Sequence, residues 1–270
     1  MKITERQEEI LNKIVQDYID LAYPISSEFL EKKHNFGICP ATIRIEMQKL
    51  TDGGFIFQPH TSAGRVPTDK GYRFFVDTLL KREIPEFEDV FEIEDIFQGV
   101  RKDYNPPTTR QGKDYNLPTT RQGKDIFKLA SRLTKFLAKE SSSFTILNLL
   151  ERDFLLKEGW EEILLEPEFG EKDLISDFVE FIESFEKHIE NLKINPVRNR
   201  RFLNGVNSGI KIYIGKENPF SKTKNFSIIS SKCYFPDDEE GVISLLGPIR
   251  MAYDKNISLI NSLVRALENF

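Results

Sequence analysis

The sequence contains few of the residues on which several common classes of protein depend. Its 270 residues include two cysteines, Cys39 and Cys233, far apart in the chain. Two such cysteines are too few for a disulfide scaffold or a cysteine-rich zinc site, and they favour a reducing compartment. No run approaches the roughly 18 apolar residues of a membrane span, and the charged N-terminus lacks the apolar core of a signal peptide. We therefore expect a cytoplasmic protein with no membrane association.

Catalytic and metal-binding signatures are also scarce. The histidines are His34, His60 and His188, and none has a partner at metal-ligand spacing. His60 and Ser62 are too close in sequence for a catalytic triad, whose members usually converge from distant positions. Neither a Gly-x-Ser-x-Gly motif nor a Walker loop is present. The sequence therefore predicts neither an enzyme nor a site for a metal or another cofactor.

The remaining composition is that of an ordinary globular protein, with 39% hydrophobic and 30% charged residues. The formal net charge of −5 excludes little, because an acidic average can hide a local basic face. Helix and strand signals are mixed along the chain, which favours an α+β fold with one large or two modest domains.

Residues 1–82 carry a dense series of helix and turn signals. The expected elements are three helices that begin after Thr4, Ser26 or Ser27, and Cys39, a strand at 55–58, a loop, a strand around Arg65–Val66, and a helix capped by Thr68. This order is that of a winged helix-turn-helix. In such a domain the third helix enters the major groove, and the loop between the strands, the wing, lies along the backbone or the minor groove.

The middle of the chain has an unusual composition. Residues 83–102 are acidic and are expected to form a linker or a solvated helix edge. Residues 103–125 contain a duplication, DYNPPTTRQGK followed by DYNLPTTRQGK. Each copy lacks apolar periodicity, which predicts a disordered insertion. The arginine and lysine in each copy leave a DNA-contacting arm as the alternative.

Residues 126–270 are expected to form a second, α+β domain. Strands are predicted at 144–150, 211–215, 227–234 and 242–246. An apolar helical stripe from Leu174 to Leu192 indicates core packing or a dimer contact, and a last amphipathic helix begins near Asp254. The basic, asparagine-rich stretch 195–209 is interpreted as a loop insertion.

The third helix, PATIRIEMQKLTDGG, has two distinct faces. Ile43, Met47 and Leu50 recur at helical spacing and must face the core. The opposite face then carries Ala41, Arg44, Ile45 and Gln48, flanked by Thr42 and Lys49. Arginine can pair with guanine and glutamine with adenine, so this face predicts a helix that reads DNA. A solvated surface helix, or a winged helix that serves in a protein complex, is the alternative.

The expected wing, QPHTSAGR, also suits DNA. Ala63 and Gly64 keep the loop slim enough to enter a groove, while Arg65 suits a narrow minor groove. The helix capped by Thr68 can hold a phosphate at its N-terminal amides. The predicted DNA-binding residues are Thr42, Arg44, Ile45, Gln48, Lys49, His60, Thr61, Ser62, Arg65, Lys70 and Arg73.

Several segments together resemble one known family. TERQEEIL, PATIRIEM, QPHTSAGRVPTDKGYRFFVD, IGKENP and GPIRMAYD are similar to HrcA, the bacterial heat-inducible transcription repressors. The likeness is dense over residues 3–80 and resumes in patches from about Gly159. It implies a winged helix-turn-helix followed by a GAF-like α/β domain that carries a dimerising insertion. It also implies a homodimer that binds an inverted-repeat operator, CIRCE, ahead of chaperone operons, with the chaperonin as the partner that keeps the repressor active.

The sequence departs from the family pattern at three points. Cys39 stands where the family usually has serine, and cysteine is a poorer helix cap. Ile45 stands where the family tends to have asparagine, and it can meet a thymine methyl but cannot hydrogen-bond a base. The middle of the chain is shorter than in the family, which predicts a reduced dimerisation insertion. A winged-helix repressor controlled by a small molecule in the GAF-like domain is the alternative function.

Overall fold

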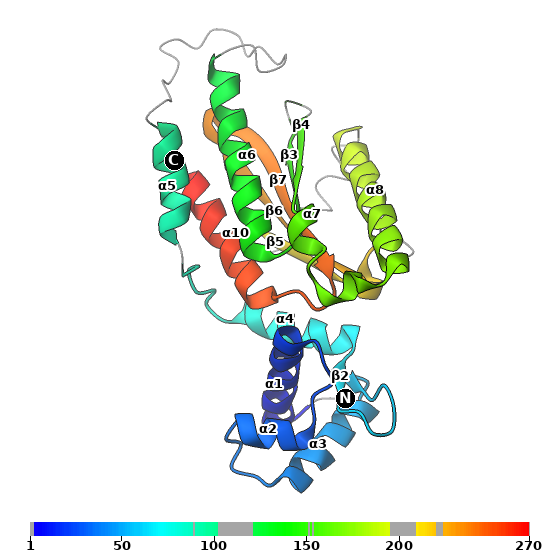
Figure 1. Ribbon diagram of the computed structural model, residues 1–270. Coiled ribbons are helices and arrows are strands. Elements are labelled where there is room, and N and C mark those ends of the chain that lie inside the picture. Colours follow the sequence, from blue (N-terminus) through cyan, green and yellow to red (C-terminus); the bar gives the residue numbers. More distant parts are fainter. Residues whose placement is uncertain are drawn as a thin grey trace.

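A computed structural model of the protein describes residues 3–88, 90–101, 121–150, 152, 154–194, 209–219 and 224–269. The duplicated sequence up to residue 120 and the predicted loop insertion at 195–208 lie outside the described residues. The N-terminal helices form one unit, and a sheet with its covering helices forms a second unit (Figure 1). Among the described residues, no helix is both long and apolar enough to cross a membrane.

The N-terminal unit follows the predicted order of elements. It consists of α1 (Glu5–Leu21), α2 (Ser27–Lys33), α3 (Pro40–Asp52), β1 (Ile56–Phe57), β2 (Val66–Pro67) and α4 (Asp69–Lys81). The predicted caps are confirmed, because Thr4, Ser26 and Thr68 each accept a hydrogen bond from a backbone amide of the helix that follows. Cys39 precedes α3 with an extended backbone and makes no such bond.

The predicted acidic linker contains a helix. Within the part of 83–102 that is described, α5 (Val90–Arg101) buries Ile93 and Phe97 in the core of the C-terminal unit. Helix α6 (Arg121–Ser141) begins within the second copy of the duplication and packs beside α5. Glu92, Glu94 and Asp95 therefore lie on a helix whose other face is packed, as expected for a solvated helix edge, whereas Glu83, Glu86 and Glu88 precede the helix.

The C-terminal unit is built on an antiparallel sheet. Its order in the described chain is β4-β3-β7-β6-β5. The strands are β3 (Phe144–Leu149), β4 (Phe154–Glu158), β5 (Ile210–Ile214), β6 (Phe226–Phe235) and β7 (Glu239–Pro248). Four of these match predicted strands, and β4, at the edge of the sheet, was not predicted. An α+β fold is thus confirmed at the level of a mixed protein with an antiparallel sheet.

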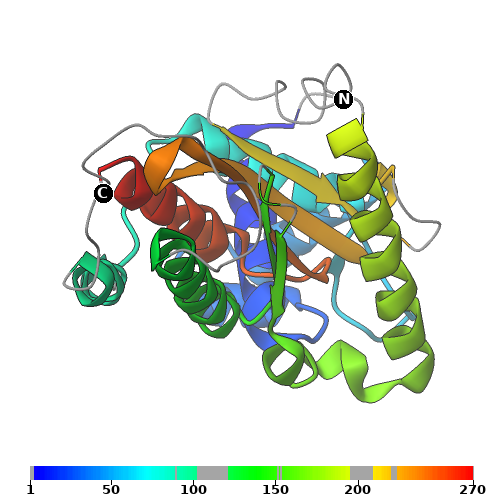
Figure 2. The same ribbon diagram turned by 90° about the horizontal axis from the view of Figure 1, so that it is seen from above.

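Helices cover both faces of this sheet (Figure 2). On one face lie α6 and α10 (Tyr253–Glu268), and on the other lie α7 (Trp160–Ile163) and α8 (Lys172–Ile194). The register explains this, because Ile146 faces α8 while the next residue, Leu147, faces α6 and α10. Phe178, Phe181 and Phe185 of the predicted α8 stripe are fully buried, so in this protomer the stripe is core.

The two units meet through α4, which lies between the N-terminal helices and the sheet (Figure 1). The ring of Tyr72 on α4 lies 5.9 Å from that of Tyr253 on α10. One continuous apolar cluster includes residues from both units, Val76 of α4 and Ile214 of β5 among them. The position of the N-terminal unit is therefore set by packing as well as by chain connection.

Candidate nucleic-acid interface

Helix α3 has the two-sided character that its sequence predicted. Ile43, Met47 and Leu50 are 0%, 3% and 1% exposed and fix the helix against the N-terminal core. Arg44 and Ile45 lie on the exposed face, together with Gln48 and Lys49. Ile45 is 57% exposed, although water does not favour an isoleucine at the surface. The exposed face thus presents an arginine, a glutamine and an apolar group along one side of a helix.

Arg44 contacts helix α2 in this conformation. Its guanidinium forms an ion pair with the carboxylate of Glu28 and lies 3.4 Å from the hydroxyl of Ser27. The backbone amide of Glu28 lowers the pKa of its own carboxyl group, and the charge of Arg44 lowers it further. Glu28 is therefore an anion at neutral pH, and it competes with a base for the guanidinium of Arg44.

Arg65 lies against α3 in this conformation, and its contact with a minor groove stays a prediction. Its Nε donates to the hydroxyl of Thr51 at 3.2 Å, and its Nη2 lies 3.5 Å from Oε1 of Gln48. Its backbone pairs with Ile25 at the base of the hairpin. The opposite end of the Gln48 amide donates to Asp52 at 2.9 Å. Arg65 therefore holds the side chain of Gln48 rather than extending beyond the loop.

The tip of the loop between β1 and β2 is exposed, and it is formed by His60, Thr61 and Ser62. The side chain of Gln58 donates to the carbonyl groups of Thr61 and Ala63, both at 2.9 Å, and so folds the loop back on itself. The tip residues therefore remain accessible, as their predicted contact with phosphate requires.

Gly64 has a packing role that the sequence did not predict. The expectation was that a glycine keeps the loop thin enough for a DNA groove. In the structure a Cβ at this position would lie 2.4 Å from the carbonyl carbon of Ile25. Glycine is therefore required by the close approach of the loop to the chain before α2.

Thr42, Lys49 and Lys70 remain near the exposed side of α3. Lys49 pairs with Glu46 at 2.9 Å, and Lys70 donates to the carbonyl of Gly53 at 2.7 Å, where the α3 C-terminus favours a cation. Both lysines are exposed, so phosphate can replace these partners. The hydroxyl of Thr42 lies 3.4 Å from Sγ of Cys39, and this hydrogen bond is the main cause that lowers the pKa of the thiol.

Arg73 makes its contacts with the C-terminal unit in this conformation, and its assignment to DNA stays a prediction. Its guanidinium forms an ion pair with Glu217, which is 144 residues away in the sequence, and donates to the carbonyl of Ile212 at 2.8 Å. Beside it, Asp69 accepts from the backbone amide of Lys216 at 3.1 Å. Arg73 therefore joins the N-terminal unit to the sheet.

The surface also includes residues that the sequence did not single out. A hollow of about 310 Å³ lies between α2, α3 and the loop, and its lining includes Ser27, Glu28, Arg44, Gln58 and Arg65. The sequence marks Glu28 in one way, by its place in the first turn of a helix. Acidic residues are common there because they interact favourably with the helix dipole, so this position does not point to DNA. Its contact with Arg44 joins two helices and has no local signature.

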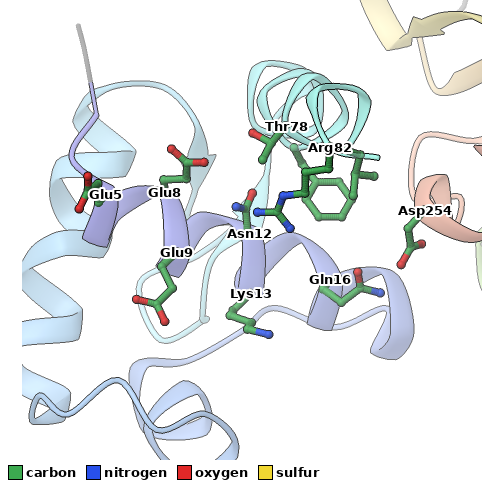
Figure 3. A pocket seen from close by; sticks show the side chains of 11 residues that line it. Glu5, Glu8, Glu9, Asn12, Lys13, Gln16, Thr78, Arg82 and Asp254 are labelled. Atoms are coloured by element: carbon green, nitrogen blue, oxygen red, sulfur yellow. The ribbon is translucent and has the colours of Figure 1, made fainter. Parts of the chain in front are cut away.

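Another groove, of about 580 Å³, lies between α1 and α4 (Figure 3). Glu5, Glu8 and Glu9 line one end, and Arg82 extends toward Asn12 across it. The carboxylates at this end disfavour a phosphate backbone, so this groove is not part of the candidate interface. In the described chain, no group of three or more histidine, cysteine, aspartate or glutamate side chains is placed to hold a metal ion.

Comparison with known proteins identifies the family. The family described as HrcA protein C terminal domain matches residues 85–257 of the chain. The chain belongs to the HrcA family. The heat-inducible transcription repressor HrcA of Oceanobacillus iheyensis is 30% identical, with 99% of this chain and 97% of that protein covered. The HrcA repressor of Natranaerobius thermophilus is 29% identical, with 99% and 98% covered. The resemblance seen in the sequence is thereby confirmed.

Two further points concern HrcA architecture. A solved structure described as a hypothetical protein at 2.2 Å resolution superposes with a TM-score of 0.66, at 18% identity, over 99% of this chain and 97% of the other, which supports the fold alone. The alignment with the N. thermophilus relative spans 348 positions, whereas this chain has 270 residues. At least 78 positions of the alignment therefore hold a residue of the relative alone. This chain is therefore shorter than that HrcA protein. The location of the missing residues in the middle of the chain stays a prediction.

Proposed function

We propose that this HrcA-family chain represses transcription of chaperone operons by binding double-stranded DNA through α3 and the loop between β1 and β2. It binds the inverted-repeat operator CIRCE as a homodimer, depends on the chaperonin for activity, and releases the operator on heat stress. The observation that carries the proposal is the exposed face of α3, where Arg44, Ile45 and Gln48 stand beside the exposed loop tip. Family membership supports the biological role.

In this proposal α3 of each protomer lies in a major groove. Arg44 pairs with a guanine edge, Gln48 pairs with an adenine edge, and Ile45 packs on a thymine methyl. A two-fold dimer places its two α3 helices about 34 Å apart, which is one turn of DNA. In this proposal the N-terminal unit is a winged helix-turn-helix, and the C-terminal unit is a GAF-like domain. The element order of the N-terminal unit and the antiparallel sheet covered on both faces support them.

Backbone contacts come from the loop and from the lysines beside α3. His60, Thr61 and Ser62 supply neutral donors from the loop tip, and Lys49 and Lys70 supply charge. Arg65 acts indirectly, because it positions Gln48. Heat releases the operator because unfolding of the C-terminal unit separates the two reading helices of the dimer.

A footprint on a CIRCE duplex, with and without chaperonin, tests the proposal. We expect protection of both half-sites, stronger protection with chaperonin, and loss of protection as the temperature rises. An Arg44→Ala chain should lose about 1–3 kcal/mol of binding free energy and discriminate less between base pairs. Equal protection of a scrambled duplex by the unmodified chain would refute sequence-specific repression.

A repressor controlled by a small molecule is the second candidate, and one feature favours it. A cleft of about 1040 Å³ lies between the two units, and its lining includes Tyr18, Tyr72 and Arg250. The residue Tyr72 is 3% exposed, and its hydroxyl has no hydrogen-bond partner among the described residues. The site would thus lie at the junction rather than inside the GAF-like domain. A metabolite that both raises the melting temperature and releases operator DNA would establish this alternative.

A further inference from the structure

Arg44 and Glu28 form an ion pair between α3 and α2 that folding stability does not explain. The two side chains are 65% and 55% exposed. Exposed ion pairs contribute little to stability, because water screens the charges and ordering two long side chains costs entropy. The carboxylate nevertheless lies on the surface proposed to meet DNA phosphates, where a negative charge opposes binding.

The surroundings of the pair show where it acts. It lines the hollow between α2, α3 and the loop, together with Ser27, Gln58 and Arg65. Arg44 also lies 3.4 Å from the hydroxyl of Ser27, so two groups on α2 hold one guanidinium. The arginine that is proposed to read a base is therefore already paired in the absence of DNA.

We infer that Glu28 is a specificity-determining residue, because it keeps Arg44 paired unless a guanine in the correct position replaces the carboxylate. This inference rests on the proposed function. On an unrelated sequence Arg44 stays with Glu28, so the arginine adds no phosphate contact and the ion pair contributes no net charge toward the backbone. On the operator, one charge-assisted pair replaces another. Specificity then arises because Glu28 penalises the wrong sequence more than the right one.

The exposure of Glu28 makes this exchange feasible. Removing one partner from a buried ion pair leaves an uncompensated charge, which is strongly unfavourable. Glu28 is more than half exposed, so its carboxylate stays hydrated after Arg44 has left. The penalty on the correct operator is therefore small, whereas on every other duplex Glu28 withholds the charge of Arg44 from the phosphates.

The test compares Glu28→Gln with Glu31→Gln in the full-length chain. Glu31 is exposed on the same helix, so its change removes the same charge nearby without releasing Arg44. Fluorescence anisotropy measures binding to a CIRCE duplex and to a scrambled duplex of equal length, from about 50 to 200 mM salt. We expect Glu28→Gln to bind the scrambled duplex about tenfold more tightly, with a salt slope steeper by about one, since the freed arginine gains a phosphate. Operator affinity should change by less than about threefold, and Glu31→Gln should change neither.

An Arg44→Ala background separates this effect from loss of charge alone. There, Glu28→Gln should tighten binding to the scrambled duplex by much less than tenfold, because it removes only the repulsion of the carboxylate and no arginine remains to be released. An equal gain on both duplexes, an undiminished tenfold gain without Arg44, or the same gain from Glu31→Gln would overturn the role of Glu28. An unmodified chain that does not prefer CIRCE would instead contradict the proposed function. The salt dependence of binding to the scrambled duplex would still show whether Glu28 restrains Arg44.

Discussion

Replacement of Arg73 decides between the sequence-based assignment and the structural one. The sequence predicted a phosphate contact, whereas the structure ties the guanidinium to Glu217 and to the carbonyl of Ile212. Arg73→Ala removes those contacts from a side chain that is 28% exposed. Hydrogen bonds to charged groups contribute about 1.5–3 kcal/mol each, and solvent screening reduces this value for partly exposed partners. We therefore expect a total loss of about 1–3 kcal/mol of stability.

Two assays on the same variant make the comparison. For a folded unit of 150–250 residues, a loss of 1 kcal/mol in stability lowers the melting temperature by about 2–4 °C. The melting temperature of Arg73→Ala should therefore fall by roughly 2–12 °C. The slope of log affinity against log salt for DNA should stay unchanged, since no phosphate contact is lost. Arg73→Lys should recover only part of the stability, because an ammonium cannot fork between a carboxylate and a carbonyl.

Lys70→Ala is the matched control on the same helix. Lys70 is exposed and stays within the proposed interface, so its loss should flatten the salt slope by about one and lower the melting temperature little. The reasoning would be refuted if Arg73→Ala flattened the salt slope while the melting temperature stayed that of the unmodified chain. That result would return Arg73 to the DNA surface.

Three further predictions concern α3 and the loop. Arg65→Ala should lower the discrimination between base pairs as much as Gln48→Ala does, and the double variant should lose no more discrimination than either single variant. Anisotropy with base-substituted operators measures this discrimination, and additive losses would contradict a shared role. Cys39→Ser should raise the melting temperature by a few degrees, because a hydroxyl is a better cap than the present thiol. The bond to Thr42 lowers the thiol pKa, so the unmodified chain gains stability as the pH rises from that lowered value toward the ordinary thiol pKa, and the serine variant should lack this gain when its melting temperature is followed over the same pH range. Gly64→Ala should cost about 1–3 kcal/mol in thermal unfolding, since its Cβ would lie 2.4 Å from a backbone carbon, and an unchanged melting curve would show that the loop is not confined there.

Local chemistry made the N-terminal unit predictable. Hydrophobic spacing defined the buried side of α3, and the hydroxyl residues Thr4, Ser26 and Thr68 marked the starts of their helices. These signals act within one or two helical turns, so no tertiary information is needed to read them. The family resemblance also came from contiguous segments. Strand β4 was missed because its residues are only partly buried at an edge and show no clear alternation.

Only the tertiary structure decided what the charged side chains do. Arg44, Arg65 and Arg73 are equally basic in the sequence, yet one pairs with α2, one holds a glutamine on α3, and one joins the sheet. An arginine is long and flexible, and its partner is whichever acceptor the packed core brings within reach. The sequence by itself determined which residues form the helices of the N-terminal unit and which of their faces are apolar, because those depend on near neighbours. The pairing of charges depends on distances between segments far apart in the sequence, 144 residues for Arg73 and Glu217, and these distances exist only once the core has formed.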